Sequence, residues 1–297
     1  MSNDKTRNDI LIIGHGEMGQ AFEFLLGKEN VDVWERHTAT QSLEEASNNR
    51  RFVFFCIPAN PVNKIAESIR DHLDRDTICL SIAKGLDDAA RPAAMAMRDA
   101  LGDHCIQGVI YGPMISEELR AGRPGFGNLA VSDPDAVQKI LSRFENSELH
   151  LYPNTDLTGM TWCAILKNVY AMAFGMADEL KLGTNVRGYL SVTSLQELSR
   201  LSVHFGGQPE TPYGFAGLGD LITTATSEDS HHHSLGRMMA RGERDNLAGE
   251  GTHTLAMVRE KNIITIQDFP LFAAVNRVVL GETDARTALR DLIASAK

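Results

Sequence analysis

The stretch Ile10-Leu11-Ile12-Ile13-Gly14-His15-Gly16-Glu17-Met18-Gly19 decides the fold of the first half of this 297-residue chain. Four apolar residues lead directly into a GxGxxG pattern that opens a helix-like run. The first glycine of this pattern makes a tight turn, the second lets backbone approach a pyrophosphate, and the third lets helix pack on strand. An incidental glycine-rich turn is the alternative. We predict a dinucleotide site with contacts at Gly14, Gly16, Glu17, Met18 and Gly19.

Short apolar runs alternate with helix-like stretches around this unit. The predicted strands are residues 10–13, 31–34, 52–57, 77–83, 105–111 and 129–131, and the predicted helices are residues 18–26, 62–73, 89–101 and 135–144. The strands are apolar on both faces, which is typical of buried parallel strands. This α/β order predicts right-handed crossovers and a Rossmann-like, doubly wound sheet.

The pattern changes near Asp156, where apolar segments lengthen and β-branched runs nearly vanish. Helices are predicted over residues 156–180, 189–205, 234–241, 252–260, 269–280 and 284–296. We therefore predict two domains, a dinucleotide-binding domain over residues 1–155 and an all-helical substrate and catalytic domain over residues 156–297.

Composition narrows the class of protein. Hydrophobic residues make up 43% of the chain and charged residues 23%, which excludes wholesale disorder. The formal net charge of -10 would repel a nucleic-acid backbone, so no nucleic-acid partner is expected. The four cysteines lack CxxC spacing and indicate no zinc site.

A polar amino terminus and the lack of a long uncharged apolar run predict a cytoplasmic protein without a membrane partner. The apolar helical region near the carboxyl terminus is consistent with a homodimer.

Lys167 falls midway along the helix predicted over residues 156–180, which is apolar nearly all round and should be buried. Its neighbours one turn away, Cys163, Ala164 and Ala171, leave room for another molecule. A buried ammonium must reach water, pair with a carboxylate or lower its pKa, and a lysine so placed can act as a general acid. The alternative is a lysine whose stem crosses apolar surface and whose head reaches solvent.

Asp220 follows the glycine-rich run Gly217-Leu218-Gly219 and begins a helix-like stretch. It fits either a helix N-cap or the carboxylate that orients Lys167, and the two roles can coexist. We predict that Lys167 and Asp220 are the catalytic residues.

Further candidates follow the ends of predicted strands, where open α/β sheets hold ligands. Lys84 fits a ligand contact or a solvated loop lysine, and Gly112 fits a plain turn or a backbone surface kept bare for a substrate. Glu35 and Arg36 stand side by side after the second strand. An acid there favours NAD and an arginine favours NADP, so both cofactors stay open.

Several segments together resemble the NAD(P)-dependent glycerol-3-phosphate dehydrogenases. Besides the glycine turn they are Ala83-Lys84-Gly85-Leu86, Gly112-Pro113, Leu166-Lys167-Asn168, residues 183–187 with Asn185, Phe215-Ala216-Gly217-Leu218-Gly219-Asp220-Leu221 and Glu250-Gly251. The resemblance implies that Lys167 is the proton donor and acceptor. It places substrate contacts at Lys84, Asn168, Asp220 and Thr224, and cofactor contacts at the Gly14 loop, Lys84, Arg36 and Glu250.

Two segments depart from that family. Where the family usually has serine, arginine, asparagine, arginine, this chain has Ser230-His231-His232-His233. Imidazole cannot make the bidentate fork of arginine and carries a full charge only below a pKa of about 6.5, which puts phosphate recognition in doubt. Met114 replaces a serine after Gly112-Pro113 and removes a hydroxyl from the substrate side. We predict Gly112, Ser230, His231 and His232 as further substrate contacts, and no metal, because consecutive histidines rarely converge on one ion.

The resemblance predicts an oxidoreductase that moves a hydride between NAD(P)H and a small ketone, with dihydroxyacetone phosphate and sn-glycerol 3-phosphate as the leading pair. The alternatives are a related dehydrogenase acting on a keto substrate that lacks phosphate, and a catalytically inactive dinucleotide-binding sensor.

Overall fold

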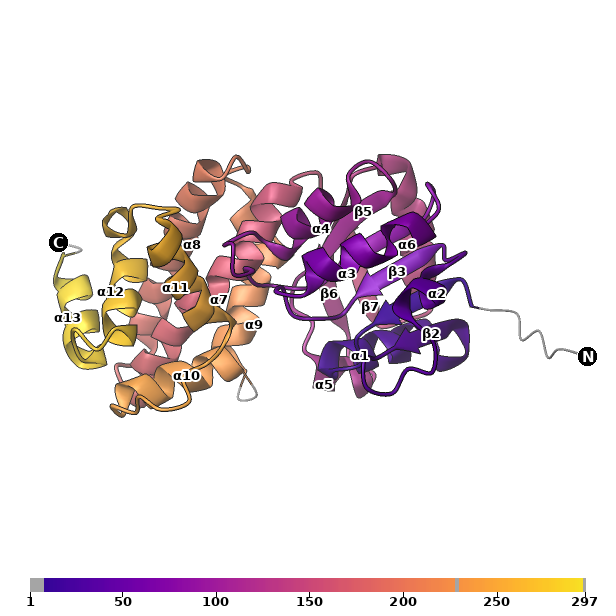
Figure 1. Cartoon of the computed structure of the whole chain (residues 1–297). Coiled ribbons are helices and arrows are strands. Elements are labelled where there is room, and N and C mark those ends of the chain that lie inside the picture. The colour runs from indigo at the N-terminus through magenta and orange to yellow at the C-terminus, as the bar shows by residue number, and fades with distance from the viewer. Residues whose placement is uncertain (1–7, 228–229, 296–297) are drawn as a thin grey trace, which may run out of the picture. The chain divides into compact units, whose positions relative to one another are not determined.

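The chain forms two compact units (Figure 1). The computed structural model describes residues 8–227 and 230–295. Among the described residues, unit 1 comprises residues 8–87 and 91–157, and unit 2 comprises residues 88–90, 158–227 and 230–295.

Unit 1 is built on a seven-stranded sheet with the order β2-β1-β3-β4-β5-β6-β7. Its strands are β1 (Ile10–Ile13), β2 (Val31–Trp34), β3 (Phe52–Phe55), β4 (Ile78–Ser81), β5 (Ile106–Tyr111), β6 (Gly125–Val131) and β7 (Leu149–Pro153). Every neighbouring pair is parallel except β5 and β6, which run antiparallel with Gly108 opposite Val131. The Rossmann-like fold class is therefore confirmed, whereas the expectation of a parallel strand at residues 129–131 is wrong for its pairing with β5.

Six helices cover the two faces of this sheet. One face packs against α1 (Glu17–Leu26), α5 (Ser116–Arg120) and α6 (Val137–Phe144), and the other against α2 (Leu43–Ser47), α3 (Val62–Ile69) and α4 (Ala93–Leu101). Along β1, Ile10 and Ile12 join the first core while Leu11 and Ile13 join the second. Successive side chains of a strand point to opposite faces, so a strand buried on both sides reads as a continuous apolar run. Short 3-10 helices complete the unit at Lys28–Asn30, Arg70–His72 and Pro134–Ala136.

The regular secondary structure in the described residues of unit 2 consists of helices. Its helices are α7 (Leu157–Glu179), which starts at the boundary between the units, α8 (Thr184–His204), α9 (Asp220–Thr226), α10 (His231–Ala240), α11 (Glu250–Lys261), α12 (Pro270–Val279) and α13 (Ala285–Ser295). Short turns at Thr211–Tyr213 and Ile266–Asp268 are 3-10 helices, and Phe215–Gly219 forms a π-helix. Every residue of α7 from Gly159 to Ala177 is buried, as its apolar sequence predicts.

Helices α7 and α10 meet with their backbones in contact. A Cβ on Gly236 would lie 2.0 Å from the Met172 carbonyl oxygen, and a Cβ on Gly175 would lie 2.0 Å from the His233 carbonyl oxygen. Neither position has room for a side chain, because the blocking atom is backbone. These two glycines therefore fix how the first half of α10 lies against the second half of α7.

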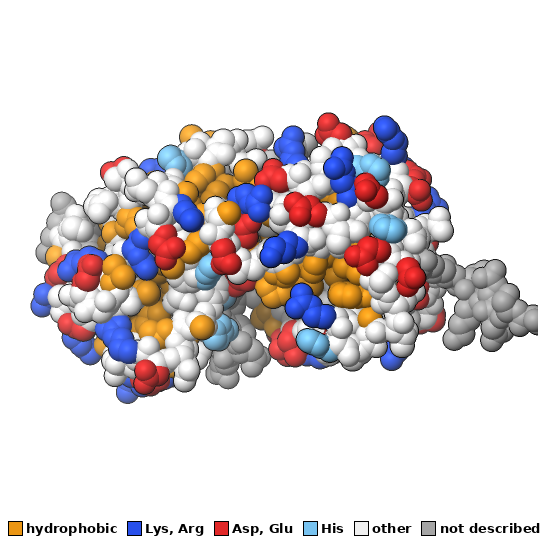
Figure 2. Space-filling model, viewed as in Figure 1, with side chains coloured by type: hydrophobic (Ala, Val, Ile, Leu, Met, Phe, Trp, Pro, Cys, Tyr) orange, Lys and Arg blue, Asp and Glu red, His pale blue; other side chains and the backbone are white. Residues whose placement is uncertain are grey.

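Charged side chains of both signs are interspersed over the face of the molecule drawn in Figure 2. Within residues 8–227 and 230–295, no helix combines the length and the apolar character needed to cross a bilayer.

The contact between α7 and α10 predicts that alanine substitutions at two glycines will differ in their effect on stability. Gly236→Ala should destabilise the protein by about 1 to 3 kcal/mol, because the added methyl forces the backbones apart. Gly188→Ala is the control, since Gly188 is exposed within α8 and has no atom within 4 Å of its Cβ position. That change should leave stability unchanged or raise it by up to about 1 kcal/mol. Thermal melting of both variants checks the difference, and equal melting temperatures would contradict the packing described.

Candidate functional site

The glycine turn of unit 1 has the geometry that the GxGxxG pattern predicts. Gly14 has a φ of 94° and donates its N–H to the Trp34 carbonyl at 2.9 Å. A Cβ on Gly19 would lie 2.1 Å from the Gly14 carbonyl oxygen, so only glycine lets α1 approach the turn. Gly16, the N-cap of α1, has nothing within 4 Å of its Cβ position and leaves its backbone bare. The turn thus offers an open helix amino terminus, which suits a pyrophosphate.

Glu35 and Arg36 differ in how they are held after β2. The Thr38 hydroxyl donates to the Glu35 carboxylate at 3.0 Å, and the backbone N–H groups of Thr38 and Ala39 donate to the Glu35 carbonyl. Arg36 is exposed. Since Glu35 is engaged by the protein and Arg36 projects into solvent, the basic side chain is the more available of the two to a ligand.

Lys84 and Gly112 lie together in unit 1. The Lys84 ammonium donates to the Gly112 carbonyl at 3.1 Å. Gly112 has no room for a side chain, because its Cβ would lie 2.3 Å from the Phe126 carbonyl oxygen. Met114 is buried in the core between the sheet and α1. The Met114 side chain packs in this core, and the loss of a hydroxyl from the substrate side stays a prediction.

Lys167 and Asp220 form a buried ion pair in unit 2. The Lys167 ammonium donates to a carboxylate oxygen of Asp220 at 3.1 Å, and only 6% and 5% of the two side chains is exposed. The same ammonium donates to the Thr224 hydroxyl, which donates in turn to the Asp220 carbonyl at 2.7 Å. Of the three outcomes open to a buried lysine, the structure shows pairing with a carboxylate.

The local chain path explains why Asp220 meets Lys167. Residues 215–219 form a π-helix that continues into α9, and Gly217 is packed so closely that its Cβ would lie 2.1 Å from the Pro212 carbonyl oxygen. Gly219 is the N-cap of α9, and Asp220 is its first residue. The N-cap interpretation of Asp220 is therefore wrong, and its carboxylate is directed to the ammonium.

The histidine triplet lies in the first turn of α10, although it was expected in a loop before a helix starting at residue 234. Ser230 caps this helix by accepting a hydrogen bond from the His233 N–H. His231 Nε2 lies 2.8 Å from the Ala248 carbonyl oxygen, and His233 Nε2 lies 2.7 Å from the Asp178 carboxylate. His231 and His233 therefore hold α10 to different parts of unit 2. Over the described ranges, no group of three or more His, Cys, Asp and Glu side chains has the arrangement of a metal site.

His232 and Asn168 both lie beside Gly251 at the start of α11. A Cβ on Gly251 would lie 3.0 Å from the Asn168 carbonyl oxygen and 3.1 Å from His232 Cδ2. Asn168 is 3% exposed and follows Lys167 on α7. The neighbouring Glu250 is the first residue of α11, and burial raises the pKa of its carboxyl while His253 opposes the shift. Several residues predicted from separate motifs are thus brought together within unit 2.

The carboxylate of Asp178, near the end of α7, contacts side chains from α8 and from the first turn of α10. Arg187 from α8 donates to both carboxylate oxygens of Asp178, and His233 contacts one of them. Burial alone would raise the pKa of Asp178, but the hydrogen bonds from Arg187 and His233 outweigh it and hold that pKa below its usual range. The ionised carboxylate therefore fixes the end of α7 and the start of α10.

A second buried carboxylate, Glu197, belongs to none of the sequence motifs that predicted the site. It accepts hydrogen bonds from the Leu271 and Phe272 N–H groups at the start of α12 and from the Tyr170 hydroxyl on α7. Burial raises the pKa of Glu197, although these hydrogen bonds oppose the shift. A sequence signal existed, because Glu197 shares a helical face with the buried residues Leu190 and Leu201.

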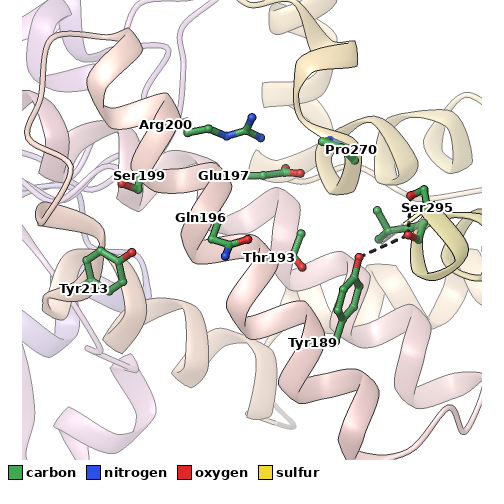
Figure 3. A pocket seen from close by; sticks show the side chains of 10 residues that line it. Tyr189, Thr193, Gln196, Glu197, Ser199, Arg200, Tyr213, Pro270 and Ser295 are labelled. Atoms are coloured by element: carbon green, nitrogen blue, oxygen red, sulfur yellow. Dashed lines mark hydrogen bonds between the residues drawn. The ribbon is translucent and has the colours of Figure 1, made fainter. Parts of the chain in front are cut away.

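Glu197 also borders a cavity of about 600 Å³. Figure 3 shows its side chain extending from α8 toward Pro270 at the start of α12. The other lining residues include Gln196, Arg200 and Tyr213. The Lys167 and Asp220 side chains do not line this cavity, so it is separate from the ion pair.

Family models and known relatives match most of the chain. Residues 29–137 match the family model of the NAD-dependent glycerol-3-phosphate dehydrogenase N-terminus, and residues 156–290 match that of the C-terminus. The glycerol-3-phosphate dehydrogenase (NAD(P)+) of Synechocystis sp. is 30% identical over 306 residues, covering 98% of this chain and 95% of that protein. The one from Gloeobacter violaceus is 32% identical over 294 residues, covering 94% and 96%. A crystal structure of glycerol-3-phosphate dehydrogenase from Coxiella burnetii superposes with a TM-score of 0.85 at 25% identity, covering 96% and 98%.

The partly buried carboxyl of Glu250 gives a pH-dependent prediction. A carboxyl whose pKa is raised by folding binds more protons in the folded state, so its contribution to stability falls as pH rises from about 4.3 through the raised pKa. Glu250→Gln removes this contribution, and its melting temperature should decline less than that of the wild type between about pH 5 and about pH 8.

Glu260→Gln, an exposed position near the other end of α11, is the matched control and should follow the wild type. Parallel melting curves for the wild type and Glu250→Gln across this range would contradict a raised pKa at Glu250.

Proposed function

Because the chain belongs to the family of NAD(P)-dependent glycerol-3-phosphate dehydrogenases, we propose that it reduces dihydroxyacetone phosphate to sn-glycerol 3-phosphate and catalyses the reverse oxidation. It is an NAD(P)-dependent dehydrogenase by membership of that family. The observation that carries the proposed chemistry is the buried pair of Lys167 and Asp220. A carbonyl that accepts a hydride becomes an alkoxide, which needs a proton from a well-placed acid.

Lys167 is the proposed acid and base of this reaction. Its ammonium gives a proton to the oxygen as the alkoxide forms, and the neutral amine takes it back in the oxidation. Asp220 and the Thr224 hydroxyl hold the nitrogen in place from two directions. Because the pair is almost fully buried, its electrostatic interaction is stronger than it would be in water.

The cofactor site is proposed at the glycine turn, with NAD and NADP both as candidates. A bound nicotinamide dinucleotide supplies or accepts the hydride. The backbone of Gly14, Gly16, Glu17, Met18 and Gly19 would hold the pyrophosphate, and the open space over Gly16 fits that role. Exposed Arg36 suits the 2′-phosphate of NADP. Lys84 and Glu250 complete the proposed cofactor contacts.

The proposed substrate contacts are Lys84, Gly112, Asn168, Thr224, Ser230, His231 and His232. Thr224 has the clearest support, because its hydroxyl accepts a hydrogen bond from the Lys167 ammonium. Two of these residues already contact other parts of the protein: the Ser230 hydroxyl caps α10, and His231 contacts the Ala248 carbonyl. That engagement favours a second candidate substrate class, small keto acids without phosphate.

We also propose that the enzyme acts in the cytoplasm as a homodimer. Support for self-association comes from large apolar side chains that project from α8 and from the turn after it. Val192, Val203 and Tyr213 are 56%, 53% and 58% exposed. Such side chains favour a protein contact when they lie together on one surface.

Removing the buried charges tests the proposed chemistry. Lys167→Met combined with Asp220→Asn avoids leaving one buried charge unpaired, which would destabilise the fold. Turnover should fall by about 10² to 10⁴, because general acid catalysis is lost. Fluorescence titration of the variant with NADH and NADPH should show cofactor affinity close to that of the wild type.

Lys261→Met, at the exposed end of α11, is the control for replacing a lysine and should turn over normally. If the double variant binds cofactor and keeps near wild-type turnover, Lys167 is not the acid.

The substrate proposal is tested by initial rates with NADH and NADPH against dihydroxyacetone phosphate and a panel of 2-keto and 3-keto acids. We expect the highest kcat/KM with dihydroxyacetone phosphate. Faster turnover of a keto acid would identify the second substrate class. Tight cofactor binding without turnover of any compound would instead indicate a dinucleotide sensor.

A further inference from the structure

Glu17 places an acidic side chain at the start of the proposed cofactor site. It is the first residue of α1, directly after the N-cap Gly16, and 63% of its side chain is exposed. A helix amino terminus attracts anions through its unpaired N–H groups and its dipole, equivalent to about half a positive charge. A carboxylate in the first turn opposes that attraction for any other anion.

Arg120 lies against this carboxylate from a distant part of the sequence. It is the last residue of α5, and its guanidinium forms an ion pair and hydrogen bond with Glu17. The two residues are 103 positions apart and both belong to unit 1. An exposed ion pair adds little stability, so stability alone gives a poor reason for this contact.

Arg120 is also linked to the backbone of the glycine turn through Gln20. Its guanidinium donates to the Gln20 side-chain oxygen at 2.8 Å, and the Gln20 amide donates to the His15 carbonyl at 3.2 Å. His15 stands between Gly14 and Gly16. The same arginine therefore holds the Glu17 carboxylate and braces the turn that would receive the pyrophosphate.

The balance of charge at this turn depends on Arg120. The His15 imidazole faces the Glu23 carboxylate at 3.0 Å, and on α5 Glu118 is paired with Arg123 at 3.5 Å. With Glu17 ionised and Arg120 absent, the first turn of α1 would present net negative charge to an incoming diphosphate. With Arg120 present, the charge of Glu17 is neutralised and the helix dipole is left to attract the anion.

We propose that Arg120 is a positioning residue for the dinucleotide, which it assists by neutralising Glu17 and bracing the glycine turn through Gln20. The proposal rests on the proposed cofactor site and adds a residue that the glycine pattern does not contain. Arg120 acts through Glu17 and Gln20, so removing Glu17 should lessen the need for it.

The test measures dissociation constants for NADH and NADPH by fluorescence titration of the full-length protein. Arg120→Gln should weaken binding about tenfold, because an unbalanced carboxylate faces the diphosphate. Glu17→Gln alone should bind both dinucleotides more tightly than the wild type, because no carboxylate then opposes the helix dipole. The double variant Glu17→Gln with Arg120→Gln should return to within about threefold of the wild type, since its remaining loss is the brace through Gln20.

Arg123→Gln is the matched control, because Arg123 lies just beyond α5 and its ion-pair partner is Glu118, whereas that of Arg120 is Glu17. Its cofactor affinity should equal that of the wild type. Added salt should also narrow the difference between Arg120→Gln and the wild type, because it screens exposed charges. A merely structural role would be rescued neither by Glu17→Gln nor by salt.

Two outcomes would overturn the proposal: unchanged affinity in Arg120→Gln, or a double variant that binds as weakly as Arg120→Gln. A wild-type protein that binds neither dinucleotide would instead refute the proposed function, so the two failures are distinguishable.

Discussion

A positive charge buried in an otherwise apolar helix is the constraint on which the helical unit depends. Lys167 lies in the middle of α7, where the residues from Gly159 to Ala177 are all buried, and its ammonium is held by Asp220 and Thr224. Breaking such a pair at one partner typically costs about 3 to 5 kcal/mol, whereas replacing both partners by apolar side chains is often neutral. Stability alone therefore gives little reason to keep the pair, whereas the proton transfer proposed for Lys167 would give one.

Close approach of backbones places the surrounding groups. Gly175 and Gly236 bring α10 against α7, Gly217 lets the chain turn into Asp220, and Gly251 lets α11 approach Asn168. In unit 1, Gly19 does the same for α1 and the turn after β1. At Gly175, Gly236, Gly217 and Gly19 a side chain would clash with backbone atoms, so the local geometry requires glycine, whereas at Gly251 a Cβ would make a tight contact. Polar side chains of the proposed site that are remote in sequence, such as Lys167 and Asp220, are thereby held at fixed separations.

Much of this arrangement could be predicted from the sequence. The apolar run of β1 and its glycine turn specify a strand packed on both faces followed by a helix, and the structure has both. The nearly all-apolar sequence of α7 made Lys167 conspicuous. Features that depend on contacts between distant residues carry no local pattern: the antiparallel pairing of β5 with β6, and the pairing of Arg120 with Glu17.

The histidine triplet shows why local reading falls short. Three like residues in a row suggest a shared role, but a helix directs successive side chains about 100° apart. His231 and His233 consequently contact Ala248 and Asp178, and Ser230 caps the helix that carries them. Which of these side chains reaches a substrate depends on where α10 begins. The sequence pattern predicts a start at residue 234, whereas α10 begins at His231.

The most direct measurement is a crystal structure of the enzyme with NAD(P)+ and a bound substrate or a non-reactive analogue. The account predicts that Lys167 Nζ lies within about 2.6 to 3.2 Å of the substrate oxygen that changes between carbonyl and alcohol, while keeping its contact with Asp220. A complex in which that oxygen is hydrogen-bonded to a different acid, with Lys167 Nζ out of reach, would contradict it.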